Sequence, residues 1–164
     1  YGHDVRSGAG AGGGRETVAR VTLVRAPLFP DPEADQGAHE FTVSLLPNAP
    51  IGAAIAQGLR LNLPDWETRG AHGIEPAVSV GDDGVAVEAV KLAEDGSGDV
   101  IVRLYEALGE RRAATLLTGF DWSGVDQVDL LERSVKQDAI DTLDSDGVSL
   151  RLDAFQLVTL RFRR

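Results

Sequence analysis

The sequence predicts an all-β protein whose C-terminal half is an antiparallel β-sandwich. Seven short segments rich in Val, Leu, Ile and Thr lie between residues 76 and 162, and turn sequences of Asp, Gly and Ser separate them. No helical pattern interrupts this series. Because consecutive strands joined by tight turns pair antiparallel, a parallel α/β sheet is not expected here.

The N-terminal part begins with a glycine run at residues 7–14. It lacks the Gly-Lys-Ser/Thr ending of a phosphate-binding loop, so we interpret it as a flexible connection between two strands. Residues 17–24 are rich in Val and Thr and predict a strand. Residues 25–37 contain three prolines and several acids, which predicts an irregular loop.

A second strand and a helix follow in the pattern. Phe41, Val43 and Leu45 alternate with polar residues, which predicts a strand with one buried face. From residue 51 to residue 62 the apolar residues recur at helical spacing between two prolines, so we expect a short helix held by packing. The polar, turn-rich residues 65–73 are the predicted domain boundary.

The seven predicted strands of the C-terminal half are residues 76–80, 85–92, 100–106, 112–118, 125–131, 148–152 and 155–162. The acidic stretch before the sixth strand has part of the spacing of a calcium loop. Thr142 stands at the first ligand position and Asp153 at the twelfth, where a bidentate Glu is usual. An Asp-Gly hairpin turn at residues 144–147 is the better interpretation.

Composition excludes several classes of function. The chain has 164 residues and no cysteine, which excludes a disulfide scaffold, a zinc ribbon and a thiol nucleophile. Sixteen basic residues against 26 acidic ones give a net charge of −10, so neither nucleic acid nor an anionic membrane surface is an expected partner. The cysteine-free composition favours the cytoplasm. The chain opens on Tyr1 rather than Met, so we expect a processed protein or a piece of a longer one.

No self-sufficient catalytic or metal site is evident. The three histidines lie far apart in the sequence, whereas a catalytic zinc needs three protein ligands, so we expect no metal in this chain. Asp31, Glu33 and Asp35 crowd one loop, and paired carboxylates are the groups that hydrolyse glycosidic bonds. Neighbouring acids in a proline-rich loop normally point to water, however. We therefore expect no catalytic residues in this chain.

Several segments nevertheless form a recognisable series. They are YGHDVR at residues 1–6, LVRAP at 23–27, PDPEAD at 30–35, HEFT at 39–42, LLP at 45–47, VRLYE at 102–106 and FQLVTLR at 155–161. In order and spacing the series resembles the C-terminal region of bacterial α-mannosidases of glycoside hydrolase family 38. The resemblance covers nearly the whole chain, and the PDPEAD loop is its most specific piece.

The resemblance implies a non-catalytic C-terminal fragment. Residues 1–66 would be the last strands and a short helix of a β super-sandwich, and residues 74–164 a small terminal β-sandwich. Family members hydrolyse α-mannosides with retention in a zinc-containing barrel, which this chain lacks. The implied partners are that barrel and the helical domain of the same parent chain, together with the α-mannoside substrate. The fragment alone is expected to be inactive, to expose apolar surface on residues 17–63 and to self-associate.

The resemblance also implies one substrate contact. In related family members an arginine from this region reaches the rim of the mannose pocket, and Arg25 matches its position, beside the loop that bears Asp31, Glu33 and Asp35. An ion pair that holds this loop is the alternative role for Arg25. The alternative function is a free-standing carbohydrate-binding β-sandwich, which would stack sugars on Trp66 or Trp122.

Overall fold

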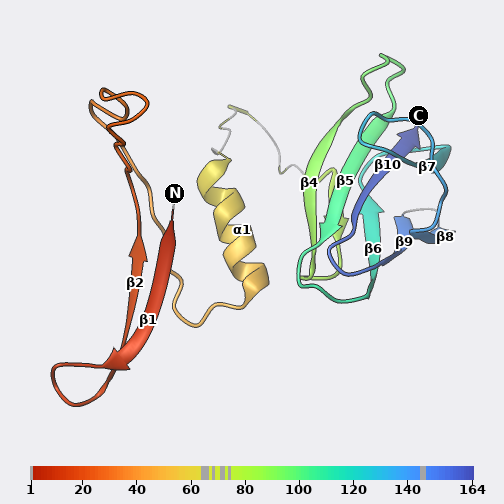
Figure 1. Ribbon diagram of the computed structural model, residues 1–164. Coiled ribbons are helices and arrows are strands. Elements are labelled where there is room, and N and C mark those ends of the chain that lie inside the picture. The colour runs from red at the N-terminus through yellow and green to blue at the C-terminus, as the bar shows by residue number, and fades with distance from the viewer. Residues whose placement is uncertain (1, 64–66, 68, 71–72, 74, 145–146) are drawn as a thin grey trace. The chain divides into compact units, whose positions relative to one another are not determined.

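The computed structural model describes residues 2–63, 67, 69–70, 73, 75–144 and 147–164. The chain forms two compact units, Tyr1–Leu45 and Leu46–Arg164 (Figure 1). Much of the predicted boundary at residues 65–73 lies outside the described residues. The division into domains 1–66 and 74–164 therefore stays a prediction.

The first unit is built on a β-hairpin. Strand β1 (His3–Ala9) pairs antiparallel with β2 (Arg15–Val21), from His3 opposite Val21 to Ala9 opposite Arg15. The glycine run closes the hairpin, as predicted. Gly13 has a φ of 81°, in the left-handed region that glycine adopts without steric cost, and its N–H donates to the Gly10 carbonyl oxygen at 3.1 Å.

The rest of the first unit is irregular, and here one prediction is wrong. Residues 38–46 form no strand, although Phe41, Val43 and Leu45 alternate as a strand should. The physical reason is that β1 and β2 pair with each other, and no other described segment offers this stretch a backbone ladder. The predicted strand at 17–24 also ends earlier than expected, at Val21.

The second unit opens with the helix α1 (Ile51–Asn62), whose bounds match the prediction. Pro50 is its N-cap, where a missing N–H costs nothing, and the Pro50 carbonyl accepts the Ala54 N–H at 3.2 Å. Ile51, Ile55 and Leu59 recur every four residues and share one face. No residue of the helix is fully buried.

The remainder of the second unit is a sandwich of two antiparallel four-stranded sheets, which confirms the predicted fold class. Their strand orders are β4-β5-β10-β7 and β3-β6-β9-β8. The strands are β3 (Val78–Val80), β4 (Val85–Leu92), β5 (Val100–Glu106), β6 (Arg112–Thr118), β7 (Gly124–Val128), β8 (Ile140–Asp144), β9 (Gly147–Leu152) and β10 (Leu157–Arg163). Strands β4, β5 and β6 match the prediction at both ends, and β8 was not predicted.

Strand β8 also decides between the calcium loop and the hairpin. It pairs antiparallel with β9, with Asp144 opposite Gly147, so the two strands form a hairpin. The two residues between them, 145 and 146, lie outside the described residues. Most of β8 is exposed at the edge of its sheet. Its acids therefore face water, and the sequence carries little apolar signal of a strand.

The core lies between the two sheets. Its fully buried side chains include Val102, Leu104, Leu116, Val148, Leu150, Leu152, Val158, Leu160 and Phe162. Phe162 is the largest of them, and the rings of Phe120 and Trp122 pack edge-on against it at centroid distances of 5.7 and 5.6 Å. The Trp122 Nε1–H donates to the Thr118 hydroxyl at 3.0 Å. Trp122 is thus a half-buried structural residue and not an exposed platform for a sugar, and Trp66, the other tryptophan considered for that role, lies outside the described residues.

Candidate functional site

All four predicted site residues lie in the irregular segment that follows β2. Arg25, Asp31, Glu33 and Asp35 are exposed. The structure brings them together in one loop, and hydrogen bonds within the loop fix its shape.

Two of the three carboxylates are engaged by the loop backbone. Asp35 Oδ2 accepts the Ala26 N–H at 3.1 Å, which ties the end of the loop to the residue next to Arg25. Asp31 Oδ1 accepts the Glu33 N–H at 2.9 Å, a local turn that Asp forms readily. Ala26 and Asp35 both have a positive φ, of 43° and 59°, so the loop closes between two left-handed residues.

His39 reinforces this closure from the other side. Its Nε2 lies 2.8 Å from the Asp35 carbonyl oxygen and donates to it, and its ring stacks on Phe41 at 5.9 Å. The histidine therefore acts within the loop. Among the described residues, no group of three or more His, Cys, Asp or Glu is placed to hold a metal ion.

Arg25 and Glu33 differ from the other two site residues. Within the described part of the chain, neither side chain forms an ion pair or a side-chain hydrogen bond. An exposed guanidinium can hydrogen-bond two neighbouring oxygens of a ligand, because its donors form a rigid fork. The loop thus presents a cation and a carboxylate to its surroundings while Asp31 and Asp35 maintain its shape. The roles of these residues toward substrate stay predictions.

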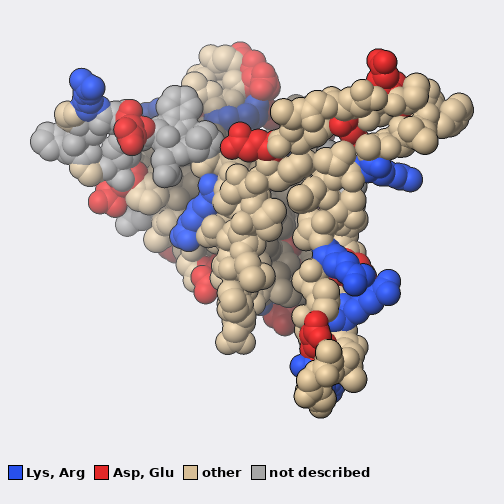
Figure 2. All heavy atoms as spheres, turned by 90° about the vertical axis from the view of Figure 1, so that its left-hand side faces the viewer, with Lys and Arg blue, Asp and Glu red and all other residues tan. Residues whose placement is uncertain are grey.

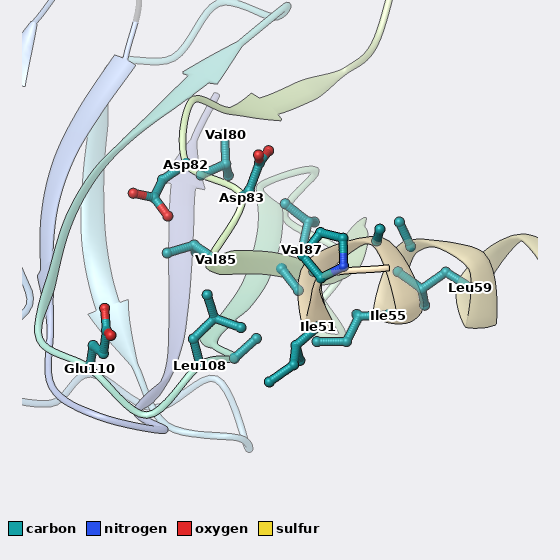
Figure 3. A pocket seen from close by; sticks show the side chains of 16 residues that line it. Ile51, Ile55, Leu59, Val80, Asp82, Asp83, Val85, Val87, Leu108 and Glu110 are labelled. Carbon is teal, nitrogen blue, oxygen red and sulfur yellow. The ribbon is translucent and has the colours of Figure 1, made fainter. Parts of the chain in front are cut away.

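The structure adds a pocket that the sequence did not predict. It has a volume of about 680 Å³ and lies within the second unit, between α1 and the sandwich (Figure 3). Ile51, Ile55 and Leu59 line it from the helix, and Val87 and Leu108 line it from the sandwich. Its lining is mostly apolar, and carboxylates come to its edge from the turn before β4 and from the turn before β6.

The one sequence signal for this pocket was a glycine inside the helix. A Cβ at Gly52 would lie 2.9 Å from the Asp83 carbonyl oxygen, closer than such atoms approach. Glycine in a helix interior costs about 1 kcal/mol relative to alanine, so its presence often marks a close approach of another backbone. Here that backbone is the turn before β4.

A buried carboxylate organises the adjacent end of the sandwich. Glu106 accepts the backbone N–H groups of Leu108, Gly109 and Phe155 at 3.0, 2.7 and 3.0 Å, and the Arg112 Nε–H at 3.2 Å. Burial would raise the pKa of Glu106, but these backbone hydrogen bonds outweigh it and lower that pKa from 4.5 to about 2. Arg112 also pairs with Asp82 at 3.0 Å. Because the acceptors and donors satisfy one another, this cluster is structural.

Comparison with known proteins now identifies the sandwich. Residues 84–160 match the family model described as the glycosyl hydrolases family 38 C-terminal beta sandwich domain. The chain belongs to this family and corresponds to the C-terminal region of its members. The matched range runs from the start of β4 into β10, and so contains most of the sandwich and its core.

Three relatives extend the similarity across the chain. The alpha-mannosidase of Saccharomyces cerevisiae is 26% identical over 173 residues and alpha-mannosidase 2C1 of Homo sapiens is 31% identical over 156 residues, alignments that cover 88% and 89% of this chain. Alpha-mannosidase G of Dictyostelium discoideum is 25% identical and its alignment covers 98% of the chain. The chain spans only 15% to 16% of the length of these relatives. None of the helices formed by the described residues has the length and apolar character needed to cross a bilayer.

Proposed function

We propose that this chain is a non-catalytic C-terminal part of a retaining α-mannosidase that hydrolyses terminal α-mannosides. The family match over residues 84–160, with α-mannosidases as relatives, carries the proposal. Because the chain spans about one sixth of those relatives, the two carboxylates of a retaining glycosidase and the expected zinc would belong to the part that it does not include. The cysteine-free sequence favours a reducing compartment, so we place the parent enzyme in the cytoplasm.

The proposed role of this part is to pack on the catalytic barrel and the helical domain of the parent. Its support is the apolar surface of residues 17–63. The exposed large apolar residues in this range are Val21, Leu23, Val24, Leu28, Phe29, Phe41, Val43, Leu45, Leu46, Ile51, Leu59, Leu61 and Leu63. These side chains lie in both units, and exposed apolar side chains in such number normally mark interfaces, through which the chain on its own would self-associate. In Figure 2, the charged side chains are blue and red, and all other residues, polar ones included, are tan.

We further propose that Arg25 contacts the substrate at the rim of the mannose pocket. The alternative role, an ion pair that holds the loop, has less support, because Asp35 and His39 already close the loop through backbone groups. Among the loop carboxylates, Glu33 is the one with neither side-chain oxygen bonded to a described residue. Arg25 and Glu33 are therefore the first residues to substitute.

Two measurements test the role of the chain in a larger enzyme. The first is the coding sequence upstream of Tyr1, where several hundred residues in frame are expected, with a His-x-Asp motif in a barrel-like pattern. The second is hydrolysis of an aryl α-mannoside by the purified chain, with and without zinc, beside the full-length protein. We expect turnover by the full-length protein alone. Measurable turnover by the chain would refute a non-catalytic role.

Arg25 is tested in the full-length protein. Arg25→Ala should raise KM about 10-fold through the loss of two hydrogen bonds to sugar hydroxyls, each worth about 0.5–1.5 kcal/mol. Arg25→Lys should recover part of that loss, because the charge remains but the fork does not. Arg15→Ala is the matched control, since Arg15 is an exposed arginine of the same unit and begins β2. An unchanged KM for Arg25→Ala would exclude substrate contact.

The second candidate function is carbohydrate binding by a free-standing module. Phe29 favours it, because this aromatic ring is 87% exposed in the same loop as Arg25. A flat exposed ring can stack on a pyranose face. Titration of the chain with mannose in a calorimeter, with wild type and Phe29→Ala, separates the two functions. Binding that Phe29→Ala abolishes would favour the module, and an absence of heat with either protein would exclude it.

A further inference from the structure

The pocket between α1 and the sandwich has the size and lining of a small-molecule site. Its volume of about 680 Å³ lies within the range of about 300–1,000 Å³ that is typical of such sites. Its walls are aliphatic: Ile51 and Ile55 lie on the helix side, and Val87 and Leu108 lie on the sandwich side (Figure 3). Elements that pack directly on one another leave few spaces larger than a water molecule, so there is room here for a ligand.

The helix side of this pocket is incompletely covered. Ile51 and Leu59 both line the pocket, yet 64% and 41% of their surfaces are exposed. Close contact with the sandwich occurs at Gly52, where an added Cβ would lie 2.9 Å from the Asp83 carbonyl oxygen. An aliphatic ligand in the pocket would remove the remaining apolar surface of the helix from water, which favours binding.

The charged residues that line the pocket within the described part of the chain are all acidic. They are Asp82, Asp83 and Glu110. The Arg112 guanidinium pairs with Asp82 at 3.0 Å and with Glu110 at 2.9 Å, but it also pairs with the buried Glu106 at 3.2 Å. One positive charge is thus shared among three carboxylates. The Asp83 carboxylate forms no ion pair or hydrogen bond with any residue that the structure describes.

The N-terminal end of α1 also borders the pocket and would favour an anion. The helix has no side-chain cap there, and its dipole is equivalent to roughly half a positive charge. On the sandwich side, the four carboxylates of Asp82, Asp83, Glu106 and Glu110 and the one guanidinium of Arg112 leave three negative charges. The negative charges outweigh the helix dipole, so the pocket favours a cation.

We propose that this pocket binds a small organic cation. Its aliphatic body lies between α1 and the sandwich, and its ammonium group lies at the rim and donates to the Asp83 carboxylate. The net charge of −10 on the chain attracts such a cation over a longer range. The proposal goes beyond the proposed function and does not depend on it, because every residue that carries it belongs to the second unit.

Three probes with the same hydrocarbon chain separate the contributions of charge and apolar surface: octylammonium, octanol and octanoate. Saturation-transfer difference NMR measures their dissociation constants with the 164-residue chain and with the full-length protein. At low salt, octylammonium should bind about 10-fold more tightly than octanol, and octanoate should bind least. At about 0.5 M salt, the advantage of octylammonium should fall to about 3-fold or less, because salt screens exposed charges.

Two pairs of variants locate the bound probe. Asp83→Asn should weaken octylammonium about 3-fold and leave octanol unchanged, whereas Asp144→Asn, at an exposed carboxylate of β8 outside the pocket, should change neither. Ala53→Leu should weaken octylammonium and octanol about 10-fold, because the larger side chain occupies the pocket. Ala54→Leu is its matched control, since Ala54 is the next residue of α1 and does not line the pocket.

Four results would overturn the proposal. The first is an absence of octylammonium binding, and the second is tighter binding of octanoate, which would mean that the helix end decides the charge. The third is equal effects of the two variants within either pair, because the probe would then lie elsewhere. The fourth is binding by the chain but not by the full-length protein, because another part of that protein would then fill the pocket. None of these results bears on hydrolysis of an α-mannoside, so the proposed function would stand.

Discussion

Replacing Phe162 by alanine should destabilise the sandwich more than any other single truncation of its core. The Phe162 side chain is fully buried and is the largest one in the core. Truncating a buried phenylalanine to alanine costs about 3–5 kcal/mol, and the edge-on contacts with Phe120 and Trp122 place the loss toward the upper part of that range. For a sandwich of this size, 3 kcal/mol lowers the melting temperature by about 12 °C or more.

The assay is urea unfolding of the 164-residue chain, followed by tryptophan fluorescence in a Trp66→Phe background so that Trp122 is the reporter. Trp122 contacts the substituted ring, so its emission reports the unfolding of this core. Phe155→Ala is the matched control, because it removes the same atoms from a ring that is 72% exposed. It should cost less than about 1 kcal/mol. A loss below about 1.5 kcal/mol for Phe162→Ala, or equal losses for both variants, would refute this account of the core.

Three further predictions concern two carboxylates, one near each end of β5, and the pocket beside α1. Asp95, in the turn before β5, accepts hydrogen bonds from Ser97 and Arg161, and these lower its pKa from 3.8 to about 2. The pKa of Glu106 is likewise lowered from 4.5 to about 2, so the stability that both groups contribute is present above pH 4.5 and is lost as the pH falls toward 2. A urea midpoint that stays constant between pH 5 and pH 2.5 would contradict this. Glu106→Gln should lower the melting temperature by about 10 °C or more, because the side-chain amide of glutamine cannot accept hydrogen bonds from all four donors. The control Glu110→Gln, at an exposed ion pair, should change the melting temperature by about 2 °C or less. Gly52→Ala should expose the pocket to a dye that binds apolar surface, because its Cβ would push α1 away from Asp83; unchanged dye binding would count against this packing.

The strands that the sequence predicted best are those whose ends carry local turn signals. Strands β4 and β5 match at both ends, because Asp- and Gly-rich turns flank them and their apolar residues face a core within the same unit. Strand β8 was missed because it lies at a sheet edge and carries exposed acids. The strand predicted over residues 41–45 failed for a different reason: its pattern is correct for a strand, but pairing is a property of two segments, and the described part of this chain contains only one of them.

The sequence likewise predicted one part of the candidate site and missed another. The loop from Arg25 to Asp35 was predicted from its prolines and acids, which act locally, and its carboxylates do bind the loop backbone. The pocket beside α1 was not predicted, because it forms between elements that are far apart in the sequence. Gly52 was the only residue that indicated it, and the sequence alone does not say what approaches a glycine.

The two units differ in how completely their own residues form a buried core and pair their polar groups. This difference is the strongest argument that the chain functions as part of a larger protein. The sandwich closes a core of fully buried side chains, and no buried side-chain polar atom lacks a partner among the residues that the structure describes. Its buried acid, Glu106, has four donors. The first unit has a two-stranded sheet, no fully buried residue among those described, and an unpaired segment with a strand's alternation. Because an isolated hairpin is only marginally stable in water, this difference supports the proposal that the first unit packs against parts of a parent protein that this chain does not include. The loop that carries Arg25 belongs to that unit, so under the proposed function its orientation toward a sugar would depend on those contacts.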